Sequence, residues 1–559
     1  MDSVYTNFDT NNTNQIVMKT KMNSILVALA AMALVGTGCE EEKPDYWAPS
    51  DDTGKTEEKS DVINLAAGKF YKVSETPMEG CEDAFPCLNY STGVKLTDEE
   101  VSESIKTYTM GVGWKGIASV DVVIDLGTKR TIEKVGLHAI EGNASAFLFA
   151  LPSGVKFYGS ADKKTWSSAV SAKVNASTGW AEAEANLTEC RYLKVTIEAP
   201  SANRAFLVDE ITAMGKHKED WKYVPKKGAY HGAFNNGLSF SGEEGSSACP
   251  VDKFDTNAGK ATSMMLWYQV MTDYPDDKYS FAEIQRVRKE HAGKNFNGKY
   301  RMFMYGWLSE ARDMSSNALK PEKSSTAKEL AEGKLDDYWK EYFTDVKEAQ
   351  KEGVEDYGPV WFRPNNEMNS NWVHWGYDGP NYVKFWRRMY NIAEQVGITG
   401  YNVFVWSSNC STYGKYKMEE YYPGDQYCDW IGTSCYYTTH NGTISHPYPS
   451  YLMKETEAVS ANKPIMISEG AYRLGGVYKG CDAKIWLQEW FNLDQTNPRV
   501  KAVVYFNQAN VAGEPECRPH KDPALLEIYK EGVAKDYWLD EIPEEVELEM
   551  IERKTKQNR

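Results

Sequence analysis

The sequence predicts a multidomain protein in which an N-terminal all-β sandwich is followed by a (β/α)8 barrel. Three observations favour this fold class. The chain has 559 residues, enough for several domains at roughly 150 residues each. Short β-branched segments separated by Gly, Asp and Ser dominate residues 62–216. In residues 228–540, apolar strands alternate with segments of helical periodicity, a pattern typical of βα units around a parallel sheet.

The first 61 residues have the features of an export signal and a linker. Residues 1–39 form a signal-peptide region, in which Lys19 and Lys21 precede an apolar run at 25–35. That run is shorter than the ~20 residues of a membrane-spanning helix. The segment ending at Cys39 resembles a bacterial lipobox, which makes Cys39 the expected lipidation site; an ordinary secretory signal with an incidental Cys is the alternative. Residues 40–61 are polar and are expected to be a flexible tether.

The acidic residues 40–42 directly after Cys39 resemble the export signal of surface lipoproteins in Bacteroides-like bacteria. The resemblance implies a protein that is anchored by lipid to the outer membrane, at the cell surface or on the periplasmic face. We expect the protein to be a monomer.

Residues 62–216 are predicted to form the β-sandwich. The segment VDVVIDLG alternates apolar and polar residues, as a half-buried strand does. The expected strands are 120–126, 134–140, 155–158 and 192–198. The motifs NLAAGK, VVIDLG, VKFYGSADKKTW, RYLKVTI and LVDEITAMG follow in an order that resembles the factor 5/8 type C (discoidin-like) fold. This resemblance implies a candidate carbohydrate-binding module with Trp114 and His138 as candidate contacts, or a spacer without ligand.

Residues 217–540 are predicted to form the barrel. Its eight expected strands are 228–234, 263–268, 301–305, 360–363, 402–406, 430–434, 464–468 and 502–506. Helical spacing is visible in three sets of apolar residues: Leu335, Trp339, Tyr342, Phe343 and Val346; Tyr382, Phe385, Trp386, Met389, Tyr390 and Ala393; and Leu525, Leu526, Ile528, Tyr529 and Val533. Residues 541–559 are charged and are expected to be a frayed or weakly helical C-terminal tail.

Two carboxylates follow predicted barrel strands, at the end where such barrels carry their chemistry. Glu367 lies in RPNNEMN after the fourth strand, and Glu469 lies in SEG at the seventh. Strands four and seven are on opposite sides of an eight-stranded ring, so both side chains can point into one cleft. Hydrolysis of a glycosidic bond needs such a pair, one carboxyl to protonate the leaving oxygen and one on the other face of the sugar. We expect the two carboxyl groups to lie ~5–5.5 Å apart, the separation of a retaining mechanism.

Composition restricts the function classes. The net charge of −17 argues against a nucleic acid as the main partner, because phosphate contacts need clustered Lys and Arg. His is rare at 8 residues and no His/Cys cluster has metal-ligand spacing, so neither a metal nor a cofactor is expected. Cys39 leaves nine further cysteines, an odd number, and Cys81 and Cys87 are close enough for a local bridge.

The motifs of residues 228–535 resemble those of glycoside hydrolase family 26, a family of retaining (β/α)8 glycosidases. The resemblance rests on GAYHGAF, WFRPNNEMNSNWVHWG, VFVWSSN, YYPGDQYCDWIG and KPIMISEGAY, which occur in the family's order. It implies that Glu367 is the acid/base and that Glu469 is the nucleophile. It also implies that Tyr436 bonds the nucleophile and that Arg363 holds its charge. Two positions depart from the family pattern. Asn366 replaces the usual His before the acid/base, and Phe506 with Asn507 stands where a Trp is common.

An aromatic content of 13% fits a sugar-binding cleft if the rings surround the two carboxylates. Trp267, Tyr268, Trp307, Trp372, Trp375, Trp406, Tyr436 and Phe506 lie at predicted strand ends or in the following loops. The expected substrate-binding set is Arg363, Asn366, Trp372, Trp375, Trp406, Asn409, Tyr436, Phe506, His231 and Trp307.

The resemblance implies a retaining endo-acting hydrolase of a β-linked plant-type polysaccharide, foremost β-1,4-mannan. Mixed-linkage β-glucan or xylan as substrate is one alternative. A non-catalytic surface glycan-binding protein is another.

Overall fold

The computed structural model describes residues 62–559 except 84–85, 88–89, 92, 145–146, 202–203, 235–249, 275–279, 292–297, 312–325, 356, 437, 441–442, 447–448, 475–481 and 508–515. The predicted lipidation site Cys39 and the predicted tether 40–61 lie outside the described residues. Within the described ranges, no helix combines the length and the apolar character needed to cross a bilayer.

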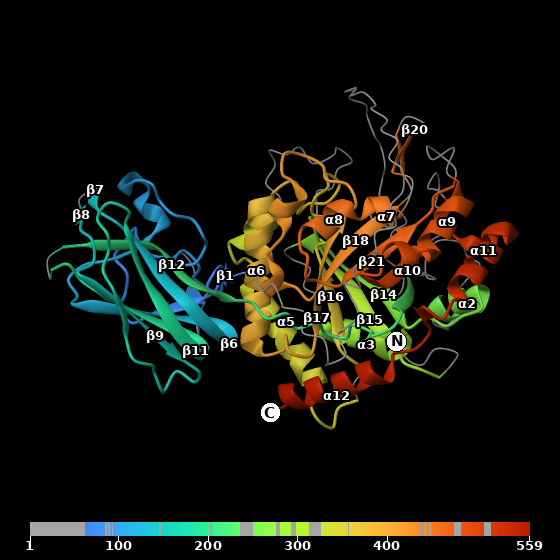
Figure 1. The fold of residues 1–559 in the computed structure, drawn as a ribbon, viewed down its shortest axis with the longest axis horizontal. Helices are drawn as coiled ribbons and strands as arrows, with labels where there is room; N and C mark the ends of the chain where they lie inside the picture. The colour runs from blue at the N-terminus through green and yellow to red at the C-terminus, as the bar shows by residue number, and fades with distance from the viewer. Residues whose placement is uncertain are drawn as a thin grey trace, which may run out of the picture.

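The N-terminal part is a sheet-rich domain, which forms the blue and cyan part of Figure 1. Its strands pair antiparallel in the order β1-β12-β6-β11-β9-β10, with β2 on β6 and β5 on β12. They are β1 (Val62–Asn64), β2 (Tyr71–Val73), β5 (Val112–Trp114), β6 (Ser119–Ile140), β9 (Gly154–Ser160), β10 (Val170–Ala172), β11 (Trp180–Glu198) and β12 (Phe206–Lys216). Two small hairpins, β3 (Pro86–Cys87) with β4 (Tyr90–Ser91) and β7 (Gly142–Ala144) with β8 (Phe147–Phe149), and the 3-10 helix η1 (Ile105–Met110) complete it.

The predicted strands 120–126 and 134–140 are two halves of one long strand, β6. Alternate residues of β6 from Val120 to Leu126 are buried, as the sequence pattern predicts. The strand continues through the glycine at 127 because its partner β11, at 19 residues, is nearly as long as β6 at 22, and the register between the two shifts at three points. Cys81 is a free, buried thiol.

The two candidate sugar contacts of this domain are buried. Trp114 is fully buried and stacks on Phe206 at a ring distance of 5.6 Å. The Nδ1 of His138 and the Oδ1 of Asp209 share a 2.6 Å hydrogen bond, and the ring of Trp180 lies 5.1 Å from the His138 ring. Both side chains therefore support the domain core, and the expectation that they contact sugar is wrong.

The second part is a closed barrel of eight parallel strands. The order is β14-β15-β16-β17-β18-β21-β22-β13, and pairing of β13 with β14 closes the ring. The strands are β13 (Ala229–Phe234), β14 (Met264–Tyr274), β15 (Met302–Ala311), β16 (Val360–Pro364), β17 (Val403–Asn409), β18 (Trp430–Tyr436), β21 (Ile465–Ala471) and β22 (Val500–Phe506). Each of the eight predicted strands is thus confirmed, with bounds that differ by a few residues.

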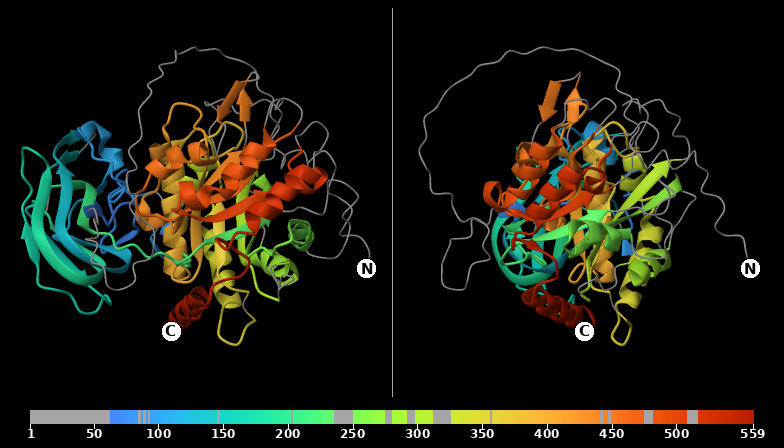
Figure 2. Two further views of the ribbon diagram at one scale, coloured as in Figure 1. Left: turned by 45° about the vertical axis from the view of Figure 1, so that its right-hand side comes forward. Right: turned by 90° about the vertical axis from the view of Figure 1, so that its right-hand side faces the viewer.

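Helices surround the barrel. They are α2 (Pro250–Ala258), α3 (Phe281–His291), α4 (Thr326–Ala331), α5 (Asp336–Ala349), α6 (Gly379–Val396), α7 (Pro449–Leu452), α8 (Lys454–Ala458), α9 (Ala483–Phe491), α10 (Leu493–Thr496) and α11 (Pro523–Val533). The 3-10 helices η2 (Met418–Tyr421), η3 (Asp425–Tyr427) and η5 (Pro519–Lys521) occupy shorter connections. The hairpin of β19 (Thr438–His440) and β20 (Thr443–His446) follows β18 at one end of the barrel, as Figure 2 shows.

Alternation along each strand separates two apolar cores. Met264, Met304 and Val405 belong to the core inside the barrel. Phe303, Tyr305 and their counterparts on neighbouring strands belong to the core between strands and helices. Both faces of the sheet are therefore buried, as is usual for parallel strands.

The C-terminal residues form a helix, α12 (Glu544–Gln557), which agrees with the helical alternative of the expected frayed or weakly helical tail. Figures 1 and 2 show α12 across the end of the barrel opposite the β19–β20 hairpin. Val546 is buried on its inner side, and β23 (Trp538–Leu539) adds to β13 just before it. The acidic first turn and the basic last turn of α12 suit the helix dipole.

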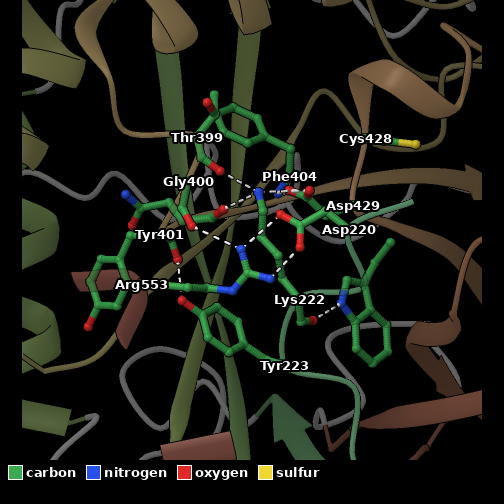
Figure 3. Close-up of polar contacts among 12 residues, drawn as sticks. Asp220, Lys222, Tyr223, Thr399, Gly400, Tyr401, Phe404, Cys428, Asp429 and Arg553 are labelled. Carbon is green, nitrogen blue, oxygen red and sulfur yellow. Dashed lines mark hydrogen bonds and ion pairs between the residues drawn. The ribbon is translucent and has the colours of Figure 1, made fainter. Parts of the chain in front are cut away.

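Polar contacts fasten α12 and the segment before β13 to the base of the barrel (Figure 3). The Arg553 guanidinium on α12 donates a 2.8 Å hydrogen bond to Asp220 and lies over the ring of Tyr223. The buried Lys222 ammonium pairs with Asp429 at 2.8 Å and donates to a backbone carbonyl at position 402. The base of the barrel is closed by these contacts, which leaves the other end for a site.

The two domains are joined by a close contact with α6, the helix nearest the N-terminal domain in Figure 1. The buried Lys69 ammonium pairs with Glu394 at 2.7 Å, and Asn391 donates to the Gly68 carbonyl at 2.6 Å. Phe70 belongs to the core of the barrel. At Gly127, φ is +81° and an added Cβ would lie 1.8 Å from the Glu394 carboxyl carbon, so this position requires glycine.

Candidate active site

Glu469 is a buried, hydrogen-bonded carboxylate at the open end of the barrel. It lies on β21 with 2% of its surface exposed. Its Oε2 accepts a 2.7 Å hydrogen bond from Arg363 Nη1 and a further one from the Tyr268 hydroxyl. Its Oε1 accepts a 2.8 Å hydrogen bond from the Tyr436 hydroxyl. Three donors from three strands thus fix both oxygens of one carboxylate.

Arg363, at the end of β16, is itself held by a layer of hydroxyl groups. Its Nε donates to Ser407 Oγ at 2.9 Å, and its Nη2 donates to Ser434 Oγ at 3.1 Å. Burial alone lowers an arginine pKa, but the charges of Tyr268 and Glu469 outweigh it and raise the pKa of Arg363. The guanidinium therefore stays charged beside Glu469.

Glu367 lies in the loop after β16, in a backbone conformation that side chains seldom adopt. Its φ is +60°, and the φ of Asn365 is +45°. Neighbouring groups hold the loop: the Glu367 N–H donates to the Ser407 carbonyl at 2.9 Å, and Trp375 Nε1 donates to the Asn366 carbonyl at 2.8 Å. Such strain is maintained where the surrounding structure enforces it, often at functional sites.

The side chain of Glu367 is buried, and its donors, which include the Ser434 hydroxyl, are uncharged groups. Trp372 Nε1 donates to its Oε2 at 2.7 Å, and Asn409 Nδ2 approaches its Oε1 at 3.4 Å. Burial, followed by the negative charge of Glu469, raises the pKa of Glu367 to about 7. The site therefore contains one carboxylate held by three donors and one carboxyl that binds its proton near neutral pH.

Several predicted residues lie around this pair. Phe506 is partly exposed at the end of β22, stacks on Phe234 at 4.6 Å and meets the edge of Tyr436 at 5.7 Å. Asn366 directly precedes Glu367 and is buried, with no hydrogen-bond partner for its Oδ1 among the described residues. Together with Arg363, Trp372, Asn409 and Tyr436, these residues form one cluster with Glu367 and Glu469.

Four other predicted substrate contacts lie in the core instead. Trp307 and Trp406 are on the outer faces of their strands, where their indole N–H groups donate to Tyr338 and to the Tyr421 carbonyl. Trp375 is 1% exposed and braces the loop of Glu367 from behind. His231 is fully buried against the helices and bonds the Tyr529 hydroxyl at 2.9 Å. Burial lowers the pKa of His231 to about 3, so it is neutral. The expectation that these four residues line the cleft is wrong.

Tyr268 is a site residue that the predicted set omitted. It lies on β14, next to Trp267, and was only one of eight aromatic residues near strand ends. Its hydroxyl accepts from Arg363 Nη1 at 2.9 Å and donates to Glu469. The serine hydroxyls of 407 and 434 were also missed, because a serine in a strand carries no distinctive sequence signal.

The closed parallel barrel and the paired carboxylates at its open end are features of the glycoside hydrolase class. Residues 311–461 match the model of glycosyl hydrolase family 26, a segment that includes Arg363, Glu367 and Tyr436. The matched segment is 151 residues long, about a quarter of the chain.

A curated relative and two solved structures were also found. The relative, "Mannan endo-1,4-beta-mannosidase A and B" of Caldalkalibacillus mannanilyticus, is 28% identical over 134 residues, 22% of this chain and 23% of its own. The match thus spans about a quarter of the relative's length.

A GH26 β-mannanase from Bacteroides ovatus is 18% identical with a TM-score of 0.42, covering 56% of this chain and 90% of that one. A protein titled GH26C from a Muricauda species is 16% identical with a TM-score of 0.43, covering 57% and 89%.

Proposed function

We propose that the protein is a retaining glycoside hydrolase in which Glu469 is the nucleophile and Glu367 is the general acid and base. The observation that carries the proposal is the contrast between the two carboxyl groups. Glu469 accepts hydrogen bonds from Arg363, Tyr268 and Tyr436, whereas burial raises the pKa of Glu367 to about 7. Two carboxyl groups with opposed environments are what acid–base cleavage of a glycoside needs.

The reaction has two steps. In the first, a Glu469 oxygen attacks the anomeric carbon while Glu367 gives its proton to the departing glycosidic oxygen. In the second, Glu367 accepts a proton from water, the water oxygen attacks the anomeric carbon, and the Glu469 carboxylate leaves. Two inversions retain the anomeric configuration.

The residues around Glu469 favour both steps. Arg363 and Tyr268 donate to the same oxygen, Oε2, so that oxygen remains stabilised as a carbonyl in the glycosyl-enzyme and as a carboxylate after it is released. Oε1 has one donor, Tyr436, and retains a lone pair for attack. We therefore assign the attack to Oε1.

We propose β-1,4-mannan as the preferred substrate, cut within the chain. The name of the curated relative and the family match within the barrel support this choice. Asn366 directly precedes Glu367, and Phe506 contacts Tyr436, which bonds Glu469. Substitutions of these two residues therefore test selectivity for mannan over β-glucan or xylan most directly.

The test is release of reducing ends from a panel of mannans, mixed-linkage glucans and xylans. Wild type should cleave mannan fastest and give oligosaccharides of several lengths from the start. Glu469→Gln and Glu367→Gln should each lose at least ~10³-fold in rate while keeping the wild-type circular dichroism spectrum. Binding of the same glycans without any cleavage by wild type would instead favour the glycan-binding alternative.

We also propose that Cys39 carries the lipid anchor and that the enzyme acts at the outer membrane. The sequence before and after Cys39 supports this proposal. Metabolic labelling with a tagged fatty acid tests it: wild type should be labelled and Cys39→Ala should not.

A further inference from the structure

A groove of about 530 Å³ lies between the N-terminal domain and the helices α5 and α6, away from the carboxyl pair. Its N-terminal side includes Lys72 on β2, Lys163 after β9 and Arg191 on β11. Its barrel side includes Lys340 and Lys347 on α5. Neither the family match nor the catalytic proposal uses this groove. Its volume is within the range of small-ligand sites, which are frequent at domain junctions.

The groove is basic although the chain has a net charge of −17. Five basic side chains line it, against two acidic ones, Asp125 and Glu348. Both acids are already paired, Asp125 with Arg191 at 3.0 Å and Glu348 with Lys351 outside the lining. The carboxylates of the groove therefore leave most of its positive charge unbalanced.

Three of the ammonium groups have no carboxylate partner within the part of the chain that the structure describes. Lys347 donates to the Val396 carbonyl at 2.7 Å, and Lys163 lies over the ring of Tyr192 at 4.3 Å. Lys72 is exposed on its strand. Like charges on two facing walls repel, and an anion between them would relieve the repulsion.

The contacts beside the groove keep its walls in place. The buried Lys69–Glu394 pair and the hydrogen bond of Asn391 to the Gly68 carbonyl join the two domains at one edge. Figure 1 shows α6 alongside the N-terminal domain at this junction. The positive charges are thus presented by a fixed site, and an incoming ligand does not have to assemble it.

We propose that this groove binds an acidic oligosaccharide whose carboxylates pair with Lys72, Lys163 and Lys347. Besides the ammonium groups, its barrel side offers the hydroxyl of Thr344 and the amide of Gln395, which suit sugar hydroxyls. Ile392 and Val396 supply apolar surface for the carbon face of a pyranose ring. A single phosphate ion would fill only a small part of the volume. The proposal does not depend on the catalytic roles of Glu367 and Glu469.

Isothermal titration of the full chain with trigalacturonate tests the proposal, with mannotriose as a neutral probe and inorganic phosphate as a small anion. Wild type should bind trigalacturonate, and binding should weaken as salt is raised from 50 to 500 mM, values chosen to span the Debye screening range of about 14 to 4 Å. Lys72→Glu and Lys163→Glu should each weaken binding at least about tenfold, the effect of losing one charge-assisted hydrogen bond.

Lys164→Glu is the matched control, since Lys164 is the exposed neighbour of Lys163 and does not line the groove. It should bind trigalacturonate as wild type does. All three variants should cleave the neutral substrate at the wild-type rate, which separates this test from that of the catalytic proposal.

Three results would overturn the proposal: no binding of trigalacturonate, an equal loss in Lys164→Glu, or phosphate binding as tight as that of trigalacturonate with the same sensitivity to Lys72→Glu.

Discussion

Glu367 and Glu469 carry the same functional group and differ in their surroundings. Glu469 accepts from a guanidinium and two phenols, whereas Glu367 accepts from one indole at short range. The sequence predicted that both residues would meet at one end of the barrel, because their strands could be counted. It could not predict the third donor, Tyr268, because a tyrosine on a buried strand is more often a core residue.

The tryptophans illustrate the same limit at the scale of single residues. Every residue of β17 is buried, so its pattern does not distinguish the face toward the barrel interior from the face toward the helices. Trp406 occupies the outer face and Ser407 the inner one. Trp372 lies in a loop, and its indole N–H reaches Glu367. The alternation of faces along a strand gives no information about such a loop residue.

Replacement of Glu367 by Gln should change how stability depends on pH. The folded protein holds the Glu367 proton more tightly than the unfolded chain does, since its pKa is raised from 4.5 to about 7. The stability from this group is therefore present below pH 4.5 and is lost as the pH rises to about 7. Glu367→Gln stays neutral, so its Tm should exceed that of wild type at pH 8, by about 2–4 °C for each kcal/mol relieved, and not at pH 5.

The exposed Glu531 on α11 provides the control for that comparison. Glu531→Gln should leave Tm unchanged at both pH values. A Tm difference for Glu367→Gln that is the same at pH 5 and pH 8 would contradict the raised pKa. In wild type, the rate of cleavage should fall above about pH 7, because Glu367 must be protonated in the first step.

Removal of the Tyr268 hydroxyl should slow catalysis without unfolding the protein. A hydrogen bond to a charged group contributes about 1.5–3 kcal/mol, so Tyr268→Phe should lower kcat roughly 10- to 100-fold. The control is Tyr305→Phe on the next strand, which loses a buried 2.6 Å hydrogen bond to Tyr342 on the helix side. Initial rates on mannan measure both; equal kcat values for the two variants would argue against a role for Tyr268 at Glu469.

At the scale of elements, period and order predicted the eight barrel strands, whereas the charged C-terminal sequence did not distinguish a frayed tail from a helix. The segment of α12 has five basic or acidic residues in its first and last turns and little apolar character. What makes it a helix is tertiary contact: Val546 enters the barrel base and Arg553 pairs with Asp220. Such contacts lie far away in the sequence and leave no local signal.

Placing a charge on the inner side of α12 should destabilise the protein. Val546 is 1% exposed, so Val546→Asp buries an unpaired carboxylate. This substitution should lower the free energy of unfolding by about 3 kcal/mol or more. Leu548 is 60% exposed on the same helix, and Leu548→Asp should change stability by less than about 0.5 kcal/mol. Urea unfolding measures the difference, and similar midpoints for both variants would mean that α12 is not docked.

Gly127 provides a test of the junction between the domains. Gly127→Ala adds a methyl group against Glu394 and also strains a backbone with φ of +81°. Gly116 has φ of +77° and no atom within 4 Å of an added Cβ. Gly116→Ala therefore introduces only the backbone strain, which should lower the free energy of unfolding by about 1 kcal/mol.

Gly127→Ala should therefore lower the free energy of unfolding by about 3 kcal/mol more than Gly116→Ala does, because it displaces the Glu394 carboxylate from the buried Lys69 ammonium. Thermal unfolding and limited proteolysis between the domains would detect it. Equal effects of the two substitutions would show that the contact with Glu394 does not matter.

At the scale of the whole molecule, averages conceal two local features. The net charge of −17 gives no sign of a basic groove between the domains, because that groove joins Lys72 and Lys163 to lysines of α5 that are 177 to 275 residues away in the sequence. Likewise, the aromatic content of 13% divides between a large core and a few rings beside the carboxyl pair. Composition predicts the class of protein, and only the fold brings the charges and rings together.

The account depends most on a covalent intermediate at Glu469, which peptide mass spectrometry can detect directly. The protein would be incubated with a 2-deoxy-2-fluoro-β-mannosyl fluoride, whose glycosyl-enzyme is released slowly, and then digested with pepsin. The account predicts one added fluorosugar on the peptide that contains Glu469, and none in Glu469→Gln. A label on another residue, or mannan hydrolysis that proceeds with inversion and no label at all, would contradict it.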